Sequence, residues 1–235
     1  MFPLCTGQAL VRQLIRDSLV LVHTFWHRKK RWKWISHKPA LIRRLKENPG
    51  KTIYLTTEQI DRLKEEAKQD HSPYIYPFIV IGLETSMRKS EILSIRLKNI
   101  HLERRIIYIP NAKAGPRDQP ITANLVQFLK SYIDLAKPDQ EWLFPTNSPS
   151  GHFRWIEIPF RRVIKKTGLD PKQVTPHTLR HTAISHLVQA GVDLPTVQRI
   201  SGHKTLAMVE RYSHQNGPHI QAAMDKLEKR YQNAG

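Results

Sequence analysis

Cysteine is nearly missing from this 235-residue chain, in which Cys5 is the single example. The chain can therefore form no internal disulfide, and it lacks the cysteine clusters that hold structural zinc. Long apolar runs are missing as well, because residues 19–26 are interrupted by His23 and are far too short to span a bilayer. The first residues carry no early positive charge of the kind found in secretory signals. These absences predict a protein of the reducing cytoplasm with no membrane association.

The sequence also lacks a glycine-rich phosphate loop, a cluster of acidic metal ligands and any internal repeat. His177 and His181 have the spacing of two zinc ligands on one helix face. The zinc protease motif needs Glu at the position of Thr178, however, and no third ligand is evident. We therefore expect no catalytic metal here, and we expect His181 and His186 to be helix-packing residues.

Acidic residues are few, since 20 Asp and Glu stand against 38 Lys and Arg and give a formal net charge of +18. Such an excess points to a polyanionic partner, and nucleic acid is the first candidate. A surface that serves solubility, a ribosomal protein and a protein of membrane surfaces remain open alternatives on charge alone.

Residues 1–50 differ from the rest of the chain. Apolar residues at helical spacing predict one amphipathic helix: Val11, Ile15, Leu19, Val22 and Trp26. Basic residues follow in two runs, and with Lys89 they are the residues that we expect to contact DNA: Arg28, Lys29, Lys30, Arg31, Lys33, Arg43 and Arg44. An Asn-Pro-Gly turn signal closes the segment at residues 48–50. The pattern predicts a helix and basic linker over residues 1–50 and a separate domain over residues 51–235.

The second domain is predicted to be mainly α with a small three-stranded antiparallel sheet. Thr56 and Gln59 form a capping-box signature at the start of one helix. Apolar residues 106–109, a Gly-Pro turn region and residues 118–121 indicate a hairpin. Further patterns predict helices at residues 56–70, 72–83, 90–97, 123–136, 157–167, 177–190, 194–201, 205–212 and 218–231.

One helix start carries the residues of a phosphate site. Thr175 is a good N-cap and Pro176 suits the first helical position. His177 then lies in the first turn, and Arg180 shares its face. Because the N-terminus of a helix attracts anions, this pair is a candidate phosphate cradle. An ordinary basic helix face is the competing interpretation.

Further motifs raise Tyr212 above an ordinary packing tyrosine. The segment Thr85-Ser86-Met87-Arg88 places an arginine at a helix start, with Glu91 three residues on, and Lys113 lies in the hairpin. Gly202-His203 stands shortly before Arg211-Tyr212-Ser213-His214. In their order and spacing over residues 52–216, these motifs resemble those of the tyrosine recombinase family, of the phage-integrase type. Ser86, Thr178 and Ser201 depart from the residues usual there, and none of them replaces a reactive group.

The resemblance implies a covalent mechanism in which Tyr212 attacks a DNA phosphate and leaves a 3′-phosphotyrosyl bond. Arg88 and Arg180 would hold the non-bridging oxygens in forked hydrogen bonds that strengthen as charge builds. His203 would hydrogen-bond the phosphate, and Lys113 would protonate the leaving 5′-oxygen.

Two more residues complete the implied site. A phenol needs help to lose its proton, and His177 is the expected acceptor. Glu91 is expected to orient the site by pairing with Arg88 or with His177. No metal, nucleotide or other cofactor is expected, because the covalent bond stores the phosphodiester energy.

The resemblance further implies double-stranded DNA as the partner, a tetramer on two duplexes, and a bacterial, nucleoid-associated location in prophage integration or excision. Residues 1–50 then resemble the last helix of a core-binding domain, so the chain is expected to be a shortened and defective recombinase. Gene decay, deliberate truncation and a misassigned start stay open. Two alternatives also stay open: a type IB topoisomerase-like enzyme and a DNA-binding protein without catalysis.

Overall fold

A computed structural model describes residues 52–213 and the residue pairs 224–225, 228–229 and 231–232. The predicted helix and basic runs of residues 1–50 lie outside the described residues. The helices, in chain order, are α2 (Thr57–Lys68), α3 (Ile75–Thr85), α4 (Lys89–Leu93), the 3-10 turn η1 (Leu97–Asn99), α5 (Ala123–Ile133), α6 (Glu157–Lys166), α7 (Pro176–Gln189), α8 (Leu194–Ser201) and α9 (Ala207–Glu210). The strands are β1 (Ile100–His101), β2 (Ile106–Ile109) and β3 (Arg117–Pro120).

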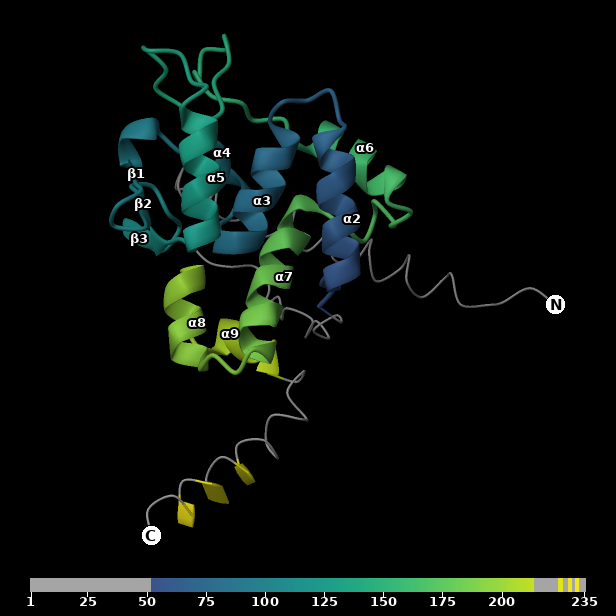
Figure 1. The fold of residues 1–235 in the computed structure, drawn as a ribbon, viewed down its shortest axis with the longest axis vertical. Helices are drawn as coiled ribbons and strands as arrows, with labels where there is room; N and C mark the ends of the chain where they lie inside the picture. The colour runs from purple at the N-terminus through teal and green to yellow at the C-terminus, as the bar shows by residue number, and fades with distance from the viewer. Residues whose placement is uncertain (1–51, 214–223, 226–227, 230, 233–235) are drawn as a thin grey trace, which may run out of the picture. The chain divides into compact units, whose positions relative to one another are not determined.

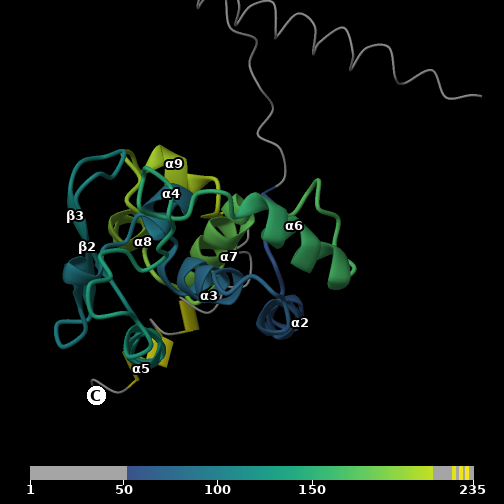
Figure 2. The same cartoon turned by 90° about the horizontal axis from the view of Figure 1, so that it is seen from above.

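The strands form one antiparallel sheet in the order β1-β2-β3. Ile107 pairs with Ile100 on one side and with Gln119 on the other. Ile107 and Ile109 are buried and Tyr108 between them is exposed, as expected for a strand with one face on the core. The sheet lies beside the helices in both views (Figures 1 and 2). The expectation of a mainly helical fold with a small three-stranded antiparallel sheet is confirmed.

Helix α3 occupies the middle of the described body in both views, with α2 and α6 to one side and the sheet to the other (Figures 1 and 2). Its apolar residues Phe78, Ile79 and Ile81 are fully buried. Gly82 lets α3 approach α7 closely, since a Cβ at this position would lie 3.0 Å from Leu179 Cδ1. The core therefore anchors α7, the helix that carries the His177–Arg180 motif.

Capping groups fix where several helices begin. The Thr56 hydroxyl accepts from the Gln59 N–H, and the Gln59 side chain accepts from the Thr56 N–H, which confirms the predicted capping box. Thr122 caps α5 in the same way through the Leu125 N–H. At α7, Thr175 is the N-cap and Pro176 opens the helix, as predicted.

Two predicted helices are shorter than expected. The helix predicted at residues 90–97 ends at Leu93, because the following backbone leaves the helix to bond residues 141–143: the Leu97 N–H donates to the Glu141 carbonyl at 2.9 Å, and the Leu143 N–H donates to the Ile95 carbonyl at 2.9 Å. The helix predicted at residues 205–212 is reduced to α9, and Tyr212 follows it in a turn. Tertiary contacts override local helical propensity in the first case.

The C-terminal part of the described body has its own small apolar cluster. Ile184 and Val188 of α7 and Val197 of α8 are buried there with Val209 and Tyr212. Helices α8 and α9 lie at one end of α7 (Figure 1). Beyond Ser213, only the pairs 224–225, 228–229 and 231–232 are described, and they are helical. Among the described residues, no helix is long and apolar enough to cross a membrane.

Candidate active site around the end of α8

Three arginines from other elements donate hydrogen bonds to the carbonyls at the C-terminal end of α8. The consecutive carbonyls of Ile200, Ser201 and Gly202 accept from three different guanidiniums. Arg117 Nη1 donates to Ile200 at 3.2 Å, Arg180 Nη1 to Ser201 at 2.7 Å, and Arg88 Nη2 to Gly202 at 3.2 Å. The last carbonyls of a helix have no partner within the helix and carry partial negative charge. One helix end thus brings together side chains from α4, β3 and α7.

This arrangement requires glycine at position 202 for two reasons: its backbone conformation and the lack of room for a side chain. It closes α8 in the left-handed conformation at φ +64°. A Cβ at this position would lie 2.6 Å from Arg117 Nε, which is closer than real Cβ contacts. Any side chain at position 202 would therefore strain the turn and displace Arg117.

Arg180 is the most deeply placed of the three arginines, with 2% of its surface exposed. Its Nη1 donates to the carbonyls of Ser86 and Ser201, each at 2.7 Å, and its Nη2 lies 3.1 Å from His203 Nε2. Burial, and next the charge of Arg88, lower the pKa of Arg180 to about 10, so its guanidinium stays charged at neutral pH.

Ser86 supplies one of those carbonyls from an unusual backbone. It ends α3 in the left-handed region, at φ 55°, and its buried hydroxyl has no hydrogen-bond partner among the described residues. Because this backbone conformation favours glycine, the serine at position 86 is strained. The turn still aims the Ser86 carbonyl at Arg180.

Glu91 ties two of the arginines together. Its carboxylate accepts from the Arg88 backbone N–H at 3.0 Å, from Arg88 Nη1 at 2.9 Å and from Arg117 Nη2 at 3.1 Å. Burial alone would raise the pKa of Glu91, but these N–H groups and charges outweigh it and hold the pKa below its usual value. Of the two partners expected from the sequence, Glu91 therefore has Arg88 and not His177, and it has Arg117 in addition.

His203 joins the group from the residue after Gly202. Its Nδ1 lies 2.7 Å from the Ser201 hydroxyl and its Nε2 faces Arg180. Burial, and then the charges of Arg180 and Arg88, lower the pKa of His203 to about 4, so the imidazole is neutral at physiological pH. Because a guanidinium can only donate, the neutral ring accepts from Arg180 at Nε2, and its single N–H lies on Nδ1 and faces the Ser201 hydroxyl.

Tyr212 lies against His181. The Tyr212 hydroxyl is 2.5 Å from His181 Nδ1, and the Tyr212 residue is 1% exposed. The Arg211 guanidinium lies 5.3 Å from the centre of the same ring, and the His203 ring centre is 6.5 Å away. His181, expected from the sequence to be a helix-packing residue, packs against Tyr212 and also brings a ring nitrogen to its hydroxyl.

His177 is exposed in the first turn of α7, and its ring meets the His181 ring edge-on at 4.7 Å. Loss of hydration, followed by the charges of Arg180, Arg211 and Arg88, lowers the pKa of His177. Arg180 and His203 are thus in direct contact, Arg88 bonds the Gly202 carbonyl beside them, and His177 lies within reach of the charges of both arginines. Within the described residues, His177 makes no hydrogen bond to Tyr212.

Two lysines predicted from the sequence lie elsewhere. Lys113 is exposed in the turn between β2 and β3, and it forms no hydrogen bond or ion pair with the described residues. Lys89 forms an ion pair with Glu157 of α6, so part of its charge is already balanced. The other basic residues expected to contact DNA lie outside the described residues: Arg28, Lys29, Lys30, Arg31, Lys33, Arg43 and Arg44.

This constellation of guanidiniums, imidazoles and a tyrosine hydroxyl agrees with a comparison of sequences. The sequence model of the Phage integrase family matches residues 53–219, which is more than half of the chain. The chain belongs to this family. Tyrosine recombinase XerD of Brucella melitensis is 27% identical over 177 residues, which cover 72% of this chain and 57% of that protein. The chain thus spans little more than half the length of that tyrosine recombinase.

Solved structures of tyrosine recombinases have the same fold. The crystal structure of XerA recombinase is 28% identical, with a TM-score of 0.61 over 74% of this chain and 65% of that one. The Tn1549 transposon integrase, solved in complex with circular intermediate DNA, is 24% identical, with a TM-score of 0.65 over 78% of this chain and 69% of that one. The described body is therefore a tyrosine recombinase catalytic domain.

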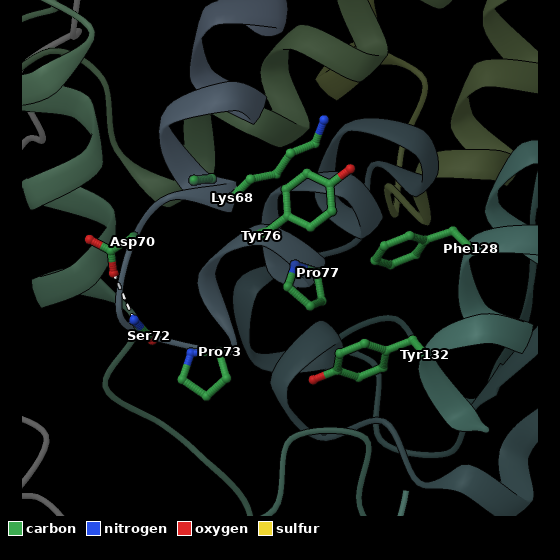
Figure 3. Close-up of a pocket in the computed structure, with 9 residues that line it drawn as sticks. Lys68, Asp70, Ser72, Pro73, Tyr76, Pro77, Phe128 and Tyr132 are labelled. Atoms are coloured by element: carbon green, nitrogen blue, oxygen red, sulfur yellow. Dashed lines mark hydrogen bonds between the residues drawn. The ribbon is translucent and has the colours of Figure 1, made fainter. Parts of the chain in front are cut away.

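A surface pocket of about 240 Å³ lies apart from these residues. Figure 3 shows the rings of Tyr76, Phe128 and Tyr132 gathered around Pro77, with Lys68 above them. None of the arginines, histidines or tyrosines of the candidate site lines it. Within the described residues, no group of three His, Cys, Asp or Glu side chains could hold a metal ion.

Sequence reasoning missed Arg117 and the contact of His181. Arg117 meets Glu91 across 26 positions and Ile200 across 83 positions, and no spacing rule links residues so far apart. A signal for His181 was present, because it follows Arg180 directly and shares the face of His177. The zinc motif was the only function considered for that spacing.

Proposed function

We propose that this chain carries out the strand cleavage and rejoining of a site-specific DNA recombinase, through a 3′-phosphotyrosyl intermediate on Tyr212. The observation that supports this most strongly is the arginine cluster at the end of α8, next to His203 and close to Tyr212. Arg88, Arg117 and Arg180 meet there with Glu91 as their carboxylate partner, which leaves an excess of positive charge. Such an excess suits a phosphodiester.

Arg88 and Arg180 are the residues that stabilise the transition state in this proposal. The phosphate gains negative charge as the phenol oxygen attacks, and donors already in place need not reorganise when it does. Both guanidiniums are held by backbone carbonyls on one side. Arg180 also donates to His203 Nε2, which helps to orient its guanidinium, and Glu91 keeps Arg88 oriented. His203 is proposed to hydrogen-bond the phosphate once DNA is bound.

Lys113 is the general acid in this proposal, because the leaving 5′-oxygen must gain a proton. Its exposed place in the β2–β3 turn lets the ammonium reach a duplex that lies over the site. The proton donor and the phosphate-binding arginines then lie on different elements. Lys113 need not break any hydrogen bond or ion pair with the described residues before it contacts the DNA.

Tyr212 must become accessible before it can attack. Its side chain lies in the apolar cluster of α7, α8 and α9, with its hydroxyl on His181. Because α9 has only four residues, we propose that DNA binding adjusts the Tyr212 segment so that the scissile phosphate reaches the Tyr212 hydroxyl while its contact with His181 is kept. The segment then delivers the hydroxyl in line with the scissile bond.

Double-stranded DNA is the proposed partner. The net charge of +18 favours a polyanion, and the structural relative from transposon Tn1549 was solved with DNA. Integration or excision of a prophage is the proposed role, with self-association on two duplexes. Residues 1–50 are proposed to be the remnant of a core-binding domain and residues 51–235 the catalytic domain.

Covalent capture on nicked DNA tests the proposal. The wild-type chain is mixed at low salt with a pool of nicked suicide duplexes whose arms are randomised, and an adduct that resists denaturant is recovered and sequenced. We expect an adduct with the wild-type chain and none with Tyr212→Phe, which loses only the hydroxyl. Tyr231→Phe is the matched control and should keep the adduct, since Tyr231 is 71% exposed and outside the cluster.

The competing functions give other results in that assay. A DNA-binding protein without catalysis binds the pool and forms no adduct, which would refute the proposal. A type IB topoisomerase-like enzyme forms adducts without sequence enrichment and relaxes supercoiled DNA that lacks any specific site. Enrichment of one sequence among the captured duplexes is the result expected of a recombinase.

The role of Lys113 has its own test. We expect Lys113→Ala to lower single-turnover cleavage about 100-fold or more, because a general acid contributes 10²–10⁴-fold. Thermal stability should not change, since Lys113 is exposed and has no partner among the described residues. A duplex with sulfur at the bridging 5′ position should restore the rate, because a thiolate leaves without protonation. A defect that persists on this duplex would refute the assignment.

A further inference from the structure

The contact between His181 and Tyr212 is closer than any other contact of the Tyr212 hydroxyl among the described residues. Nδ1 of His181 and the hydroxyl oxygen are 2.5 Å apart, and the two rings are tilted by 38° with centres 5.8 Å apart. Tyr212 is buried in one apolar cluster with Ile184, Val188 and Val209, which holds its ring in the structure without DNA. This separation fits one short hydrogen bond between the hydroxyl and the imidazole nitrogen.

The direction of this hydrogen bond follows from the charges around it. Burial raises the pKa of Tyr212, and Arg211 and Arg180 offset that only in part. Burial, and then His177, Arg211, Arg180 and His203, lower the pKa of His181 to about 3. At neutral pH the phenol therefore keeps its proton and the imidazole is uncharged. The hydroxyl donates and the Nδ1 lone pair accepts.

Resting on the function proposed above, we propose that His181 is a catalytic residue that takes the proton of Tyr212 during attack on the phosphate. The Tyr212 O–H bond breaks and an Nδ1–H bond forms on His181, while the phenol oxygen bonds to phosphorus. The P–O5′ bond breaks and Lys113 supplies a proton to the leaving oxygen. On rejoining, Lys113 takes back the proton of the attacking 5′-hydroxyl, and the imidazolium returns its proton to the phenol oxygen as the phosphotyrosyl bond breaks. Atoms and charge balance without any further reactant.

The same surroundings explain why the base works only with DNA in place. Without DNA, proton transfer is disfavoured, because burial raises the pKa of Tyr212 while burial and the neighbouring charges lower the pKa of His181 to about 3. The cations that weaken His181 are Arg180 and Arg211, joined by His177 and His203 when these are protonated. A phosphate bound among the arginines cancels their field, which strengthens His181 as a base. Substrate binding thus switches on proton removal.

His177 is the residue that sequence reasoning chose for this task, and the structure distinguishes the two. His177 is exposed and contacts the edge of the His181 ring, whereas His181 contacts the hydroxyl itself. In this arrangement His177 is left free to donate to the phosphate at the N-terminus of α7. In this proposal His181 accepts the proton of Tyr212, and His177 donates a hydrogen bond to the phosphate.

Replacement by asparagine separates acceptance of a hydrogen bond from acceptance of a proton. Asparagine places an amide oxygen near the position of Nδ1, so His181→Asn keeps an acceptor for the hydroxyl but has no base. We expect His181→Asn and His181→Ala to lower single-turnover cleavage of the captured duplex by the same factor, about 100-fold or more. The rate of His181→Asn should rise about tenfold per pH unit above neutrality, as hydroxide replaces the lost base. Wild-type cleavage by His181→Asn would overturn the proposal in favour of a positioning role.

Two controls complete the experiment. His186→Gln, on the same helix, keeps a side-chain N–H for the Leu55 carbonyl that His186 Nε2 contacts at 3.0 Å, and it should cleave like the wild type. Duplex binding by His181→Asn, measured by gel shift, should match that of the wild type, so the loss lies in the chemical step. A loss of binding equal to the loss of cleavage would overturn the proposal.

Nitrogen NMR of the free chain tests the contact without any activity. We expect His181 to have its proton on Nε2 and a bare Nδ1, and Tyr212→Phe should shift the Nδ1 resonance. Unmoved His181 signals would overturn the inference whatever the DNA assay gives. A wild-type chain that forms no adduct while the shift is present would instead overturn the proposed function, and with it the catalytic role of His181.

Discussion

Two carboxylates in this molecule hold arginines, and their surroundings differ. Asp70, in the segment after α2, accepts both forked N–H groups of Arg162 from α6 at 2.7 Å, so one negative charge meets one positive charge. Glu91 is shared by Arg88 and Arg117, and Arg180 donates to the Ser201 carbonyl, which is next to the Gly202 carbonyl that accepts from Arg88. The first group is balanced and joins two helices. The second has a surplus of positive charge.

The difference shows how to separate a structural ion pair from a site that awaits an anion. Clustered like charges raise the energy of the free protein: burial, and with it the charge of Arg88, lowers the pKa of Arg117 and of Arg180. Backbone carbonyls at the end of α8 offset part of that cost. A phosphate would offset the rest, and we infer that the surplus is retained for this purpose.

The largest expected effect distinguishes the two groups by activity. Arg180→Lys keeps the charge but loses the planar fork that reaches Ser86, Ser201 and His203, so we expect adduct formation to fall by about 10²–10³-fold. Arg162→Lys loses the fork on Asp70 and should leave cleavage per folded molecule unchanged. Single-turnover capture of both variants, with folded protein measured by circular dichroism, makes the comparison. Equal losses in the two variants would contradict the distinction.

The next expected effect concerns stability and its pH dependence. Hydrogen bonds from Arg162 hold the pKa of Asp70 at about 2, below the ordinary value of 3.8. Because the folded pKa is lowered, the stabilisation is present above pH 4 and is lost as the pH falls toward 2. The shift corresponds to about 2 kcal/mol. We expect Asp70→Asn to cost roughly 1–3 kcal/mol at pH 7, measured by urea unfolding, and to flatten this acid limb.

The variant Glu91→Gln tests the carboxylate of the arginine cluster, for comparison with Asp70→Asn. It should lower cleavage by positioning Arg88 poorly, whereas Asp70→Asn should not affect cleavage. If Asp70→Asn slows cleavage per folded molecule as much as Glu91→Gln does, the two carboxylates are not functionally distinct.

Much of the active site could be predicted from the sequence because its residues lie in short motifs. Arg88, Arg180 and His203 each lie within a few residues of a helix end whose capping residues can be recognised. Lys113 and His177 were placed on the correct elements, though neither bonds the cluster. Arg117 could not be predicted, because its partners come from α4 and α8.

The fold shows the same division. The capping box at Thr56 and the apolar spacing of α7 are local, so both helices begin where the sequence predicts. The helix predicted at residues 90–97 ended early because the backbone from Ile95 to Leu97 bonds to residues 141–143, more than forty positions away. Sequence patterns predict a helix boundary correctly where the capping residue is nearby in the sequence. They fail where a distant segment supplies the hydrogen bonds that end the helix.

The smallest expected effect is at Ser86, whose left-handed backbone supports Arg180. Glycine adopts φ near 55° without the clash of a Cβ, so Ser86→Gly should stabilise the chain by about 1 kcal/mol or less. The added freedom of glycine in the unfolded chain offsets part of that gain. Thermal unfolding of Ser86→Gly beside Ser86→Ala measures it, since alanine keeps the strain. A lower midpoint for Ser86→Gly than for Ser86→Ala would show that the turn is not strained.

Mass spectrometry of the trypsin-digested adduct tests the central claim most directly, because it identifies the residue that carries the DNA. Cleavage after Arg211 gives a peptide that begins with Tyr212 and ends at Lys226, and cleavage after Arg230 places Tyr231 in a separate peptide. After nuclease treatment, we expect the mass of a 3′-linked nucleotide on the 212–226 peptide, with fragment ions that assign it to Tyr212. Attachment to Tyr231 or to any other residue would contradict the account.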